Sequence, residues 1–307
     1  MKLYVAPIVS AILFASCAST GSIPQKEAAP AASPATAVST APASPGANSA
    51  TVAEPAKKQS RVITIKVPVE KKSLVKFADG SLDEYTLSDY DGANVLLLTQ
   101  TRYSASGALL ERTDFSYTDG KVTTKTVKDG DGKVTSQRLY TYNPQGLLIK
   151  EFAQDGAGKP ISTFEYAYDA KGDRTSWIVK DSKGVEVAQT VYTYKDGRLQ
   201  GAELRDGTGK KTGSGLYEYT ADGKIRAQKY YNALDSLIRI ESTYWDGDRV
   251  QREERTTAGG QVQQRIDYTY GSSGELTQKV IEDFVGKSKK IIQYEYIFRD
   301  EQKTVEE

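Results

Sequence analysis

Aspartate and glycine recur in short clusters along the chain, and closely spaced carboxylates are candidate ligands for a calcium ion. The densest cluster is Asp129-Gly130-Asp131-Gly132. It lacks the spacing and the terminal glutamate of an EF-hand loop, and it does not follow the nonapeptide register of calcium-binding β-helices. Asp-Gly is also the strongest short-range signal for a β-hairpin turn. We therefore expect these aspartates to form turns, and we predict no metal site and no cofactor.

Catalytic side chains are the second chemical possibility. Glu165, Glu218 and Glu295 are candidates for a hydrolase with paired carboxylates, but each stands beside a tyrosine in a polar setting that predicts solvation. The sequence contains no histidine, which is the commonest general acid or base and the commonest metal ligand. It also contains no phosphate-binding loop, no Gly-x-Ser-x-Gly elbow and no zinc-ligand spacing. We predict that no residue is catalytic and that the protein is not an enzyme.

Aromatic side chains are the third possibility, because their faces can stack against sugar rings while a polar tip hydrogen-bonds. The chain has 20 tyrosines and 7 phenylalanines. Its two tryptophans, Trp177 and Trp245, depart from the pattern of the tyrosines and are therefore the better candidates for ligand contacts. The alternative is that all the aromatic residues pack the fold.

The tyrosines follow a period that identifies the elements carrying them. A Tyr-x-Tyr pattern, or a variant of it, recurs every 25 or 26 residues, with its second aromatic residue at Tyr117, Tyr142, Tyr168, Tyr194, Tyr219, Tyr244, Tyr270 and Tyr296. A regular period of this size is the signature of a repeat architecture. We predict that these eight tyrosines are structural repeat positions.

Each repeat contains two alternating runs separated by glycine-containing breaks, so half a period corresponds to one strand and one turn. At Asp196-Gly197 we expect a two-residue type I′ turn that places Tyr194 opposite Leu199. The same offset of five residues predicts Tyr117 opposite Val122 and Phe77 opposite Leu82. An offset of six, typical of a three-residue loop with a bulge, predicts the pairs Tyr142–Leu148, Tyr219–Ile225, Tyr244–Val250 and Tyr270–Leu276.

The sequence therefore predicts an all-β fold, an antiparallel meander of about 16–18 short strands built from 25–26-residue repeats. Alternation places both tyrosines of a pair on one face of the sheet and small or polar residues on the other. Open sheets of more than about ten strands tend to curl or flatten. We expect a long twisted or curled sheet with the tyrosines inside. Charged residues on both faces argue against a barrel that faces lipid.

The N-terminal part of the chain has a different composition. Lys2 and the apolar run from Val5 to Phe14 are typical of a secretory signal peptide, which we assign to residues 1–16. Residues 17–60 are rich in Ala, Pro, Ser and Thr and are predicted to form a disordered tether, because they offer little apolar surface to bury. Residues 61–307 form the predicted β-hairpin repeat domain.

The stretch Leu-Phe-Ala-Ser-Cys that ends at Cys17 resembles the signal of bacterial lipoproteins. That resemblance implies that the thiol of Cys17, the single cysteine of the chain, is lipidated. It also implies attachment to a membrane of the cell envelope through the N-terminal lipid, on the periplasmic or the surface face of the outer membrane. The alternative is an ordinary secretory signal with an incidental cysteine.

Phrases such as Tyr168-Asp169-Ala170-Lys171-Gly172 and Tyr194-Lys195-Asp196-Gly197-Arg198-Leu199 resemble the YD (Rhs-type) repeat. The resemblance covers roughly residues 80–300. It implies a meandering sheet, and some members of that family have been linked to carbohydrate binding.

The charge balance narrows the partners. The formal net charge is +1 with the two signs interspersed, so we predict no nucleic-acid partner. Two hypotheses of function follow. The first is a lipid-anchored interaction module of the cell envelope that binds a polymer, a glycan or a protein. The alternative is a purely structural lipoprotein of a surface coat without a specific ligand.

Overall fold

The computed structural model describes residues 60–306. The predictions made for the signal peptide, for most of the tether and for Cys17 concern residues 1–59 and lie outside the described residues. A compact unit comprises Ile65–Glu301, and the strand residues beyond it, 60–64 and 302–306, are extended. Across the described residues, no helix is long and apolar enough to cross a membrane.

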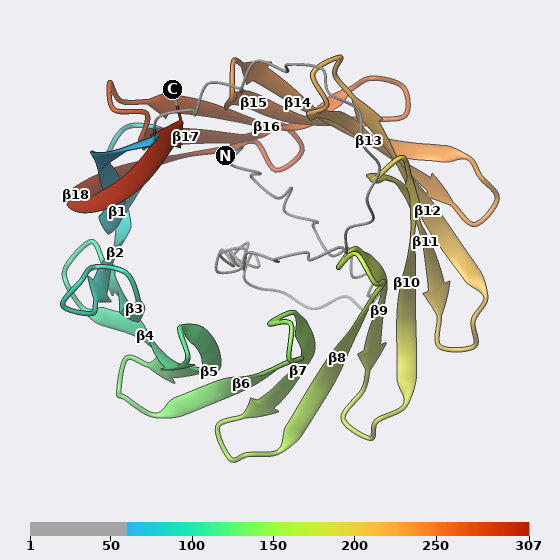
Figure 1. The fold of residues 1–307 in the computed structure, drawn as a ribbon, viewed down its shortest axis with the longest axis horizontal. Coiled ribbons are helices and arrows are strands. Elements are labelled where there is room, and N and C mark those ends of the chain that lie inside the picture. Colours follow the sequence, from blue (N-terminus) through green and yellow to red (C-terminus); the bar gives the residue numbers. More distant parts are fainter. Residues whose placement is uncertain (1–59, 307) are drawn as a thin grey trace, which may run out of the picture. The chain divides into compact units, whose positions relative to one another are not determined.

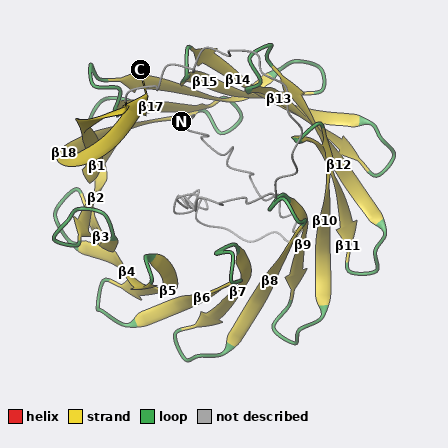
Figure 2. Ribbon diagram, viewed as in Figure 1, coloured by secondary structure: helices red, strands yellow, loops and turns green. Residues whose placement is uncertain are grey.

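The described chain consists of strands joined by short turns, each strand antiparallel to its neighbour in sequence (Figures 1 and 2). This confirms the predicted all-β antiparallel meander. The eighteen strands are β1 (Ser60–Phe77), β2 (Leu82–Tyr90), β3 (Leu97–Ser104), β4 (Leu109–Thr118), β5 (Lys121–Asp129), β6 (Val134–Tyr142), β7 (Leu148–Asp155), β8 (Pro160–Tyr168), β9 (Arg174–Lys180), β10 (Glu186–Lys195), β11 (Arg198–Asp206), β12 (Lys211–Tyr219), β13 (Ile225–Asn232), β14 (Leu237–Asp246), β15 (Arg249–Thr257), β16 (Val262–Tyr270), β17 (Leu276–Asp283) and β18 (Ser288–Glu306).

The sheet closes into a barrel, because β1 pairs with β18 as well as with β2. At this seam Lys76 Nζ donates to Gln293 Oε1 at 2.7 Å, and Lys72 Nζ lies 3.5 Å from Glu295 Oε1. The long curled sheet expected from the sequence therefore continues to curl until its two edges meet. Closure removes the unpaired edges that a long open sheet would expose.

Two of the hairpin turns have the predicted type I′ conformation. Asp119 and Gly120 have φ values of 51° and 72°, and Asp196 and Gly197 have 52° and 72°. Tyr194 lies opposite Leu199, as predicted. The pairs Tyr117–Val122, Tyr142–Leu148, Tyr219–Ile225 and Tyr270–Leu276 are also confirmed.

Two predicted pairs are wrong. Leu82 pairs with Lys76, because Phe77, the last residue of β1, donates its N–H to the carbonyl of Ser81, one residue before Leu82. Val250 pairs with Trp245, so the repeat position in that hairpin belongs to Trp245, whereas Tyr244 lies one residue earlier and on the other face.

Most other turns are held by the side chain of their first residue. In the turn after β5, Asp129 Oδ1 accepts the N–H groups of Asp131 and Lys133 at 3.1 and 2.9 Å. The same pair of hydrogen bonds, to residues two and four positions on, is made by Asp155, Asp169, Asp181, Asp206 and Asn232. The aspartates of the Asp-Gly clusters therefore form turns, as predicted.

The glycine that follows the aspartate in some of these turns does not supply the positive φ of a type I′ turn. The φ of Gly156 is not positive, but a Cβ atom there would lie 1.8 Å from the carbonyl oxygen of Val134. The equivalent Gly130 and Gly207 approach the carbonyls of Leu109 and Glu186 in the same way. Glycine is needed at these positions because each turn lies against the backbone of an earlier hairpin.

A β-bulge accompanies almost every strand pair in the described sheet. Between β4 and β5, Ser116 pairs with Thr124 and Tyr117 with Val122, which leaves Thr123 as the extra residue. Bulges bend a strand and increase its twist, so their repetition supplies the curvature that closes the sheet. The equivalent extra residues opposite the ends of β2, β6, β8, β10, β12, β14 and β16 are Leu98, Ile149, Thr175, Gln200, Arg226, Gln251 and Thr277.

The second aromatic residue of each repeat donates a hydrogen bond to the carbonyl 20 residues earlier, and we call this series the tyrosine ladder. In each case the acceptor is the residue just before a bulge, where the sheet's own hydrogen bonding is locally disrupted. The donors are Tyr117, Tyr142, Tyr168, Tyr194, Tyr219, Trp245, Tyr270 and Tyr296, and the distances run from 2.6 to 3.0 Å.

The face that carries the tyrosines is the inner one. Tyr192, Tyr217 and Tyr230 are 8%, 7% and 4% exposed although the barrel wall is a single sheet. Leu139 and Leu216, which alternate with tyrosine-face residues and therefore point to the other side, are 39% and 49% exposed. Side chains converge on the concave face of a closed sheet and cover one another there, which accounts for this difference.

The ladder hydrogen bonds predict a measurable loss of stability. Replacing Tyr219 by Phe removes the 2.6 Å hydrogen bond to Leu199 and leaves that carbonyl without its partner. We expect the free energy of unfolding, measured by urea titration, to fall by about 1–3 kcal/mol. The matched control is Tyr244→Phe, since Tyr244 is 47% exposed and outside the ladder, and its effect should stay within about 0.5 kcal/mol. Equal losses in the two variants would contradict the ladder.

Candidate ligand-binding site on the tyrosine face

One inner position changes its chemistry from repeat to repeat while the ladder stays constant. It is the third residue after each ladder acceptor, and we call it the variable position. In chain order it is occupied by Gln100, Lys125, Glu151, Trp177, Ala202, Gln228, Glu253 and Lys279. A position that the scaffold does not specify is free to serve a ligand, so this series is where a site is to be sought on the inner face.

Trp177 is the aromatic member of this series and is half-buried on β9. Its neighbours across the two adjacent strands are Tyr166 and Thr190. The indole ring stacks on Phe164 with centroids 6.1 Å apart and planes inclined by 13°. Phe164 and Trp177 thus form a stacked aromatic pair on the inner face.

Charged groups border this aromatic surface. Arg138 donates to Glu151 at 3.1 Å, and its guanidinium carbon lies 5.6 Å from the centre of the Phe164 ring. The hydroxyl of Tyr166 donates to Glu151 at 2.6 Å. Arg174 lies over the ring of Tyr166, 4.8 Å from its centre. The cluster therefore combines flat apolar faces with a carboxylate and two guanidinium groups.

The indole N–H of Trp177 is buried and has no hydrogen-bond partner within residues 60–306. An unsatisfied donor of this kind costs about 1–3 kcal/mol. Arg174 Nε, in the same cluster, is also without a partner among the described residues. These two N–H groups are the unsatisfied buried donors of the cluster.

Trp245 lies in a different environment from Trp177. Its Nε1 donates to the carbonyl of Ile225 at 2.8 Å, which is the hydrogen bond that tyrosine makes in the other repeats. The ammonium group of Lys224 lies 5.6 Å from the centre of the indole ring. Trp245 is therefore a member of the ladder, and the structure does not bring it together with Trp177.

Tyr244, which the sequence assigns to the repeat series, lies on the outer face and donates a 3.3 Å hydrogen bond to Glu254. The other seven predicted repeat tyrosines are all ladder donors. Several carry a cation from the preceding hairpin over the ring: Lys121 over Tyr142, Arg198 over Tyr219 and Arg249 over Tyr270. These contacts occupy the rings in packing.

The three carboxylates that were considered for a hydrolase lie on strands that do not pair with one another. Glu165 accepts from Lys180 at 2.7 Å, Glu218 lies 2.5 Å from Lys229, and Glu295 faces Lys72 at the seam. All three are on the outer face, on different strands. Among the described residues there is no group of three or more His, Cys, Asp or Glu side chains that could hold a metal ion.

The sequence identified Trp177 by its departure from the repeat, but it missed the groups around it. No sequence pattern marks Arg138, Glu151 and Arg174 as neighbours, because they belong to three different strands, β6, β7 and β9. The 25–26-residue spacing, applied to the variable position as well as to the tyrosines, could have located Glu151 but not the two arginines.

Comparisons with known proteins add the following findings. No family model and no curated protein matches the chain. Among solved structures it is similar to a porin-like protein from Bacteroides uniformis, with 13% identity, a TM-score of 0.38 and coverage of 74% of this chain and 96% of that chain. A porin-like protein from Bacteroides vulgatus gives 11%, 0.30, 74% and 98%. The Tc holotoxin pore of Photorhabdus luminescens gives 13%, 0.21, 74% and 15%, so the chain spans a small part of that protein. These values carry no argument about function.

The electrostatics of the inner face predict a pH dependence of stability. Burial raises the pKa of Tyr166, Tyr230 and Tyr268, and the neighbouring carboxylates of Glu151, Glu241 and Glu253 raise it further. The unfolded chain loses these protons near pH 10 while the folded chain keeps them. The contribution of these three tyrosines to the free energy of unfolding is therefore fully present below about pH 10, and it is lost as the pH rises above that value.

The measurement is the free energy of unfolding in urea at pH values between about 8 and 11.5. Tyr268→Phe should reduce the slope above pH 10 by up to about 1.4 kcal/mol per pH unit, the contribution of one proton. An unchanged slope in that variant would show that Tyr268 ionises alike in the folded and unfolded chains.

Proposed function

We propose that this chain is a lipid-anchored interaction module of the bacterial cell envelope, and that it binds a glycan polymer on the tyrosine face at Trp177. In this proposal the stacked pair of Phe164 and Trp177 packs against the C–H face of a sugar ring. Glu151, Arg138 and the indole N–H then hydrogen-bond the hydroxyl groups. Aromatic surfaces combined with a few polar groups are typical of small-ligand sites.

The observation that carries the proposal is the contrast between the two tryptophans. Trp245 is required by the scaffold, since it makes the ladder hydrogen bond. Trp177 stands at the variable position, where other repeats have Ala202 or Gln228, and its N–H lacks a partner in the described structure. Its presence is therefore not explained by the repeat, and a ligand explains it.

The outer face supports an environment of water rather than lipid around the barrel wall. It carries ion pairs between neighbouring strands, such as Lys180–Glu165 at 2.7 Å and Arg252–Asp267 at 2.7 Å. A wall that faces lipid presents an apolar band about 25 Å tall instead. In this proposal the membrane contact is made through the lipid on Cys17.

The binding test uses the purified full-length chain with glycan arrays and peptidoglycan sacculi. We expect binding that weakens by about 30-fold in Trp177→Ala, since truncating an anchoring tryptophan typically costs 2 kcal/mol or more. The matched control is Trp245→Tyr, which retains a ladder donor and should bind like the parent chain. Absence of binding to every glycan would overturn the proposal and favour the structural surface-coat alternative.

The anchor has its own test, which is metabolic labelling with a fatty-acid analogue in a bacterial host. We expect label on the parent chain and none on Cys17→Ala, because that variant lacks the thiol that would carry the lipid. Label retained by the variant would refute lipidation at Cys17 and return the N-terminus to an ordinary secretory signal.

A further inference from the structure

The turn between β17 and β18 departs from the repeat. The other pairs of strands that follow each other in sequence contain a register shift, whereas β17 and β18 pair without one from Asp283↔Ser288 to Gln278↔Gln293. Asp283 Oδ1 accepts the N–H groups of Val285 and Gly286 at 2.9 and 2.8 Å. The N–H of Phe284 donates to the carbonyl of Gln263 at 2.9 Å, so the turn is fastened to the start of β16.

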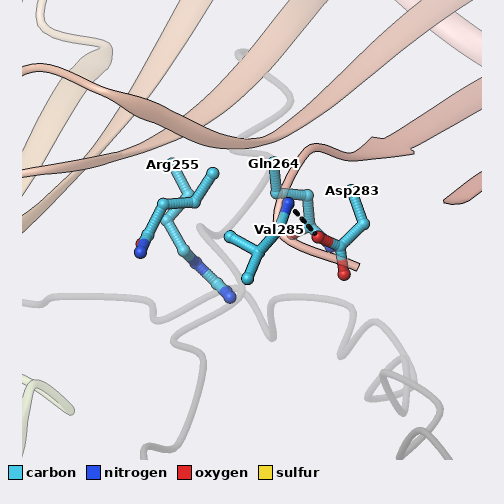
Figure 3. Close-up of a pocket in the computed structure, with 5 residues that line it drawn as sticks. Arg255, Gln264, Asp283 and Val285 are labelled. Atoms are coloured by element: carbon cyan, nitrogen blue, oxygen red, sulfur yellow. Dashed lines mark hydrogen bonds between the residues drawn. The ribbon is translucent and has the colours of Figure 1, made fainter. Parts of the chain in front are cut away.

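An open pocket of about 210 Å³ lies beside this turn and is lined by Arg255, Gln263, Gln264, Asp283 and Val285. Figure 3 shows Arg255 and Asp283 on opposite sides of it, with Gln264 and Val285 between them. At about 30 Å³ per water molecule the pocket has room for about seven waters, which is the size of an amino acid or a dipeptide. Trp177 is not among its lining residues.

Both charged groups of the pocket have capacity left for a ligand. Arg255 donates through Nε to Glu241 at 3.2 Å, which leaves the terminal nitrogens of its guanidinium available. Glu241 also accepts from Tyr230 and forms an ion pair with Arg239 at 3.4 Å, so its charge is shared among three neighbouring side chains. Asp283 uses Oδ1 for the turn, and within the described structure its Oδ2 accepts no hydrogen bond.

We propose that this pocket binds a small zwitterion of the amino-acid type, a free amino acid or a dipeptide. Arg255 binds the carboxylate through a charge-assisted hydrogen bond, and Asp283 Oδ2 accepts from the ammonium group. The amides of Gln263 and Gln264 pair with the polar backbone of the ligand. Val285, which is 70% exposed, covers a small apolar side chain. A neutral sugar carries no negative charge to pair with Arg255 and no positive charge to pair with Asp283.

The site is independent of the glycan-binding proposal, because the two share no residue. Trp177→Ala should therefore leave this binding unchanged, and failure of one proposal does not imply failure of the other.

The test is isothermal titration calorimetry of the full-length chain with L-alanine and with L-alanyl-L-alanine. We expect at least one of the two zwitterions to bind. Capping its amino group with acetyl, or its carboxylate as an amide, should each weaken binding about tenfold or more, the loss expected for one charge-assisted hydrogen bond. Capped forms that bind as tightly as the free ones would overturn the proposal, as would the absence of binding by both zwitterions.

Asp283→Asn separates binding from folding. Asn232 holds the turn between β13 and β14 in a similar way, with its Oδ1 accepting from Leu234 and Ser236 at 2.9 and 3.0 Å, so the amide oxygen of asparagine can make such bonds without the charge. We expect this variant to fold and to bind about tenfold or more weakly. The matched control is Asp206→Asn, which makes the same change in a turn outside the pocket and should bind like the parent chain. Unchanged binding in Asp283→Asn would exclude the carboxylate from the site.

Discussion

The barrel depends on one recurring interaction, the hydrogen bond from a ladder aromatic residue to the carbonyl that precedes a β-bulge. The bulges bend the sheet, but each one disturbs the hydrogen bonding between strands at the place where it occurs. The tyrosine of the following repeat donates a hydrogen bond from its hydroxyl to the carbonyl at that place, as Tyr142 does to Val122. Val122 in turn lies opposite the preceding ladder residue, Tyr117. Curvature and its compensation are therefore supplied by the same residues, once per repeat, around the wall.

This arrangement separates the residues that build the wall from those that can serve a ligand. Because the ladder, the bulges and the capped turns satisfy the scaffold, the variable position can hold lysine, glutamate, alanine or tryptophan without changing the fold. Trp245 has been absorbed into the ladder, and Trp177 has not. Similarly, the β17–β18 turn lacks the bulge of the other hairpins, and a pocket with opposite charges lies beside it. Because the repeat accounts for the residues that build the wall, a residue or turn that departs from it indicates a role other than building the wall.

The predictions from the sequence were wrong where two different structural causes favour the same residue types. Asp-Gly signals a hairpin turn both at Asp196-Gly197 and at Asp155-Gly156, but the type I′ conformation forms at the first, whereas at the second glycine is needed for close approach to the backbone of Val134. Tyr244 and Trp245 are adjacent aromatic residues, and a period of 25 or 26 fits either one. Assigning the ladder position required the hydrogen bond of Trp245, which depends on a strand 20 residues away.

The sequence by itself determined the approximate number of strands, their antiparallel order, most hairpin registers and the two faces of the sheet, because turn chemistry and alternation act over a few residues. The tertiary structure decided that the sheet closes, since the pairing of β1 with β18 joins segments more than 200 residues apart and has no local signal. It also decided which side chains meet at Trp177 and beside Val285. Those contacts cross strands, and they are set by the register and curvature of the whole wall rather than by any short stretch of the chain.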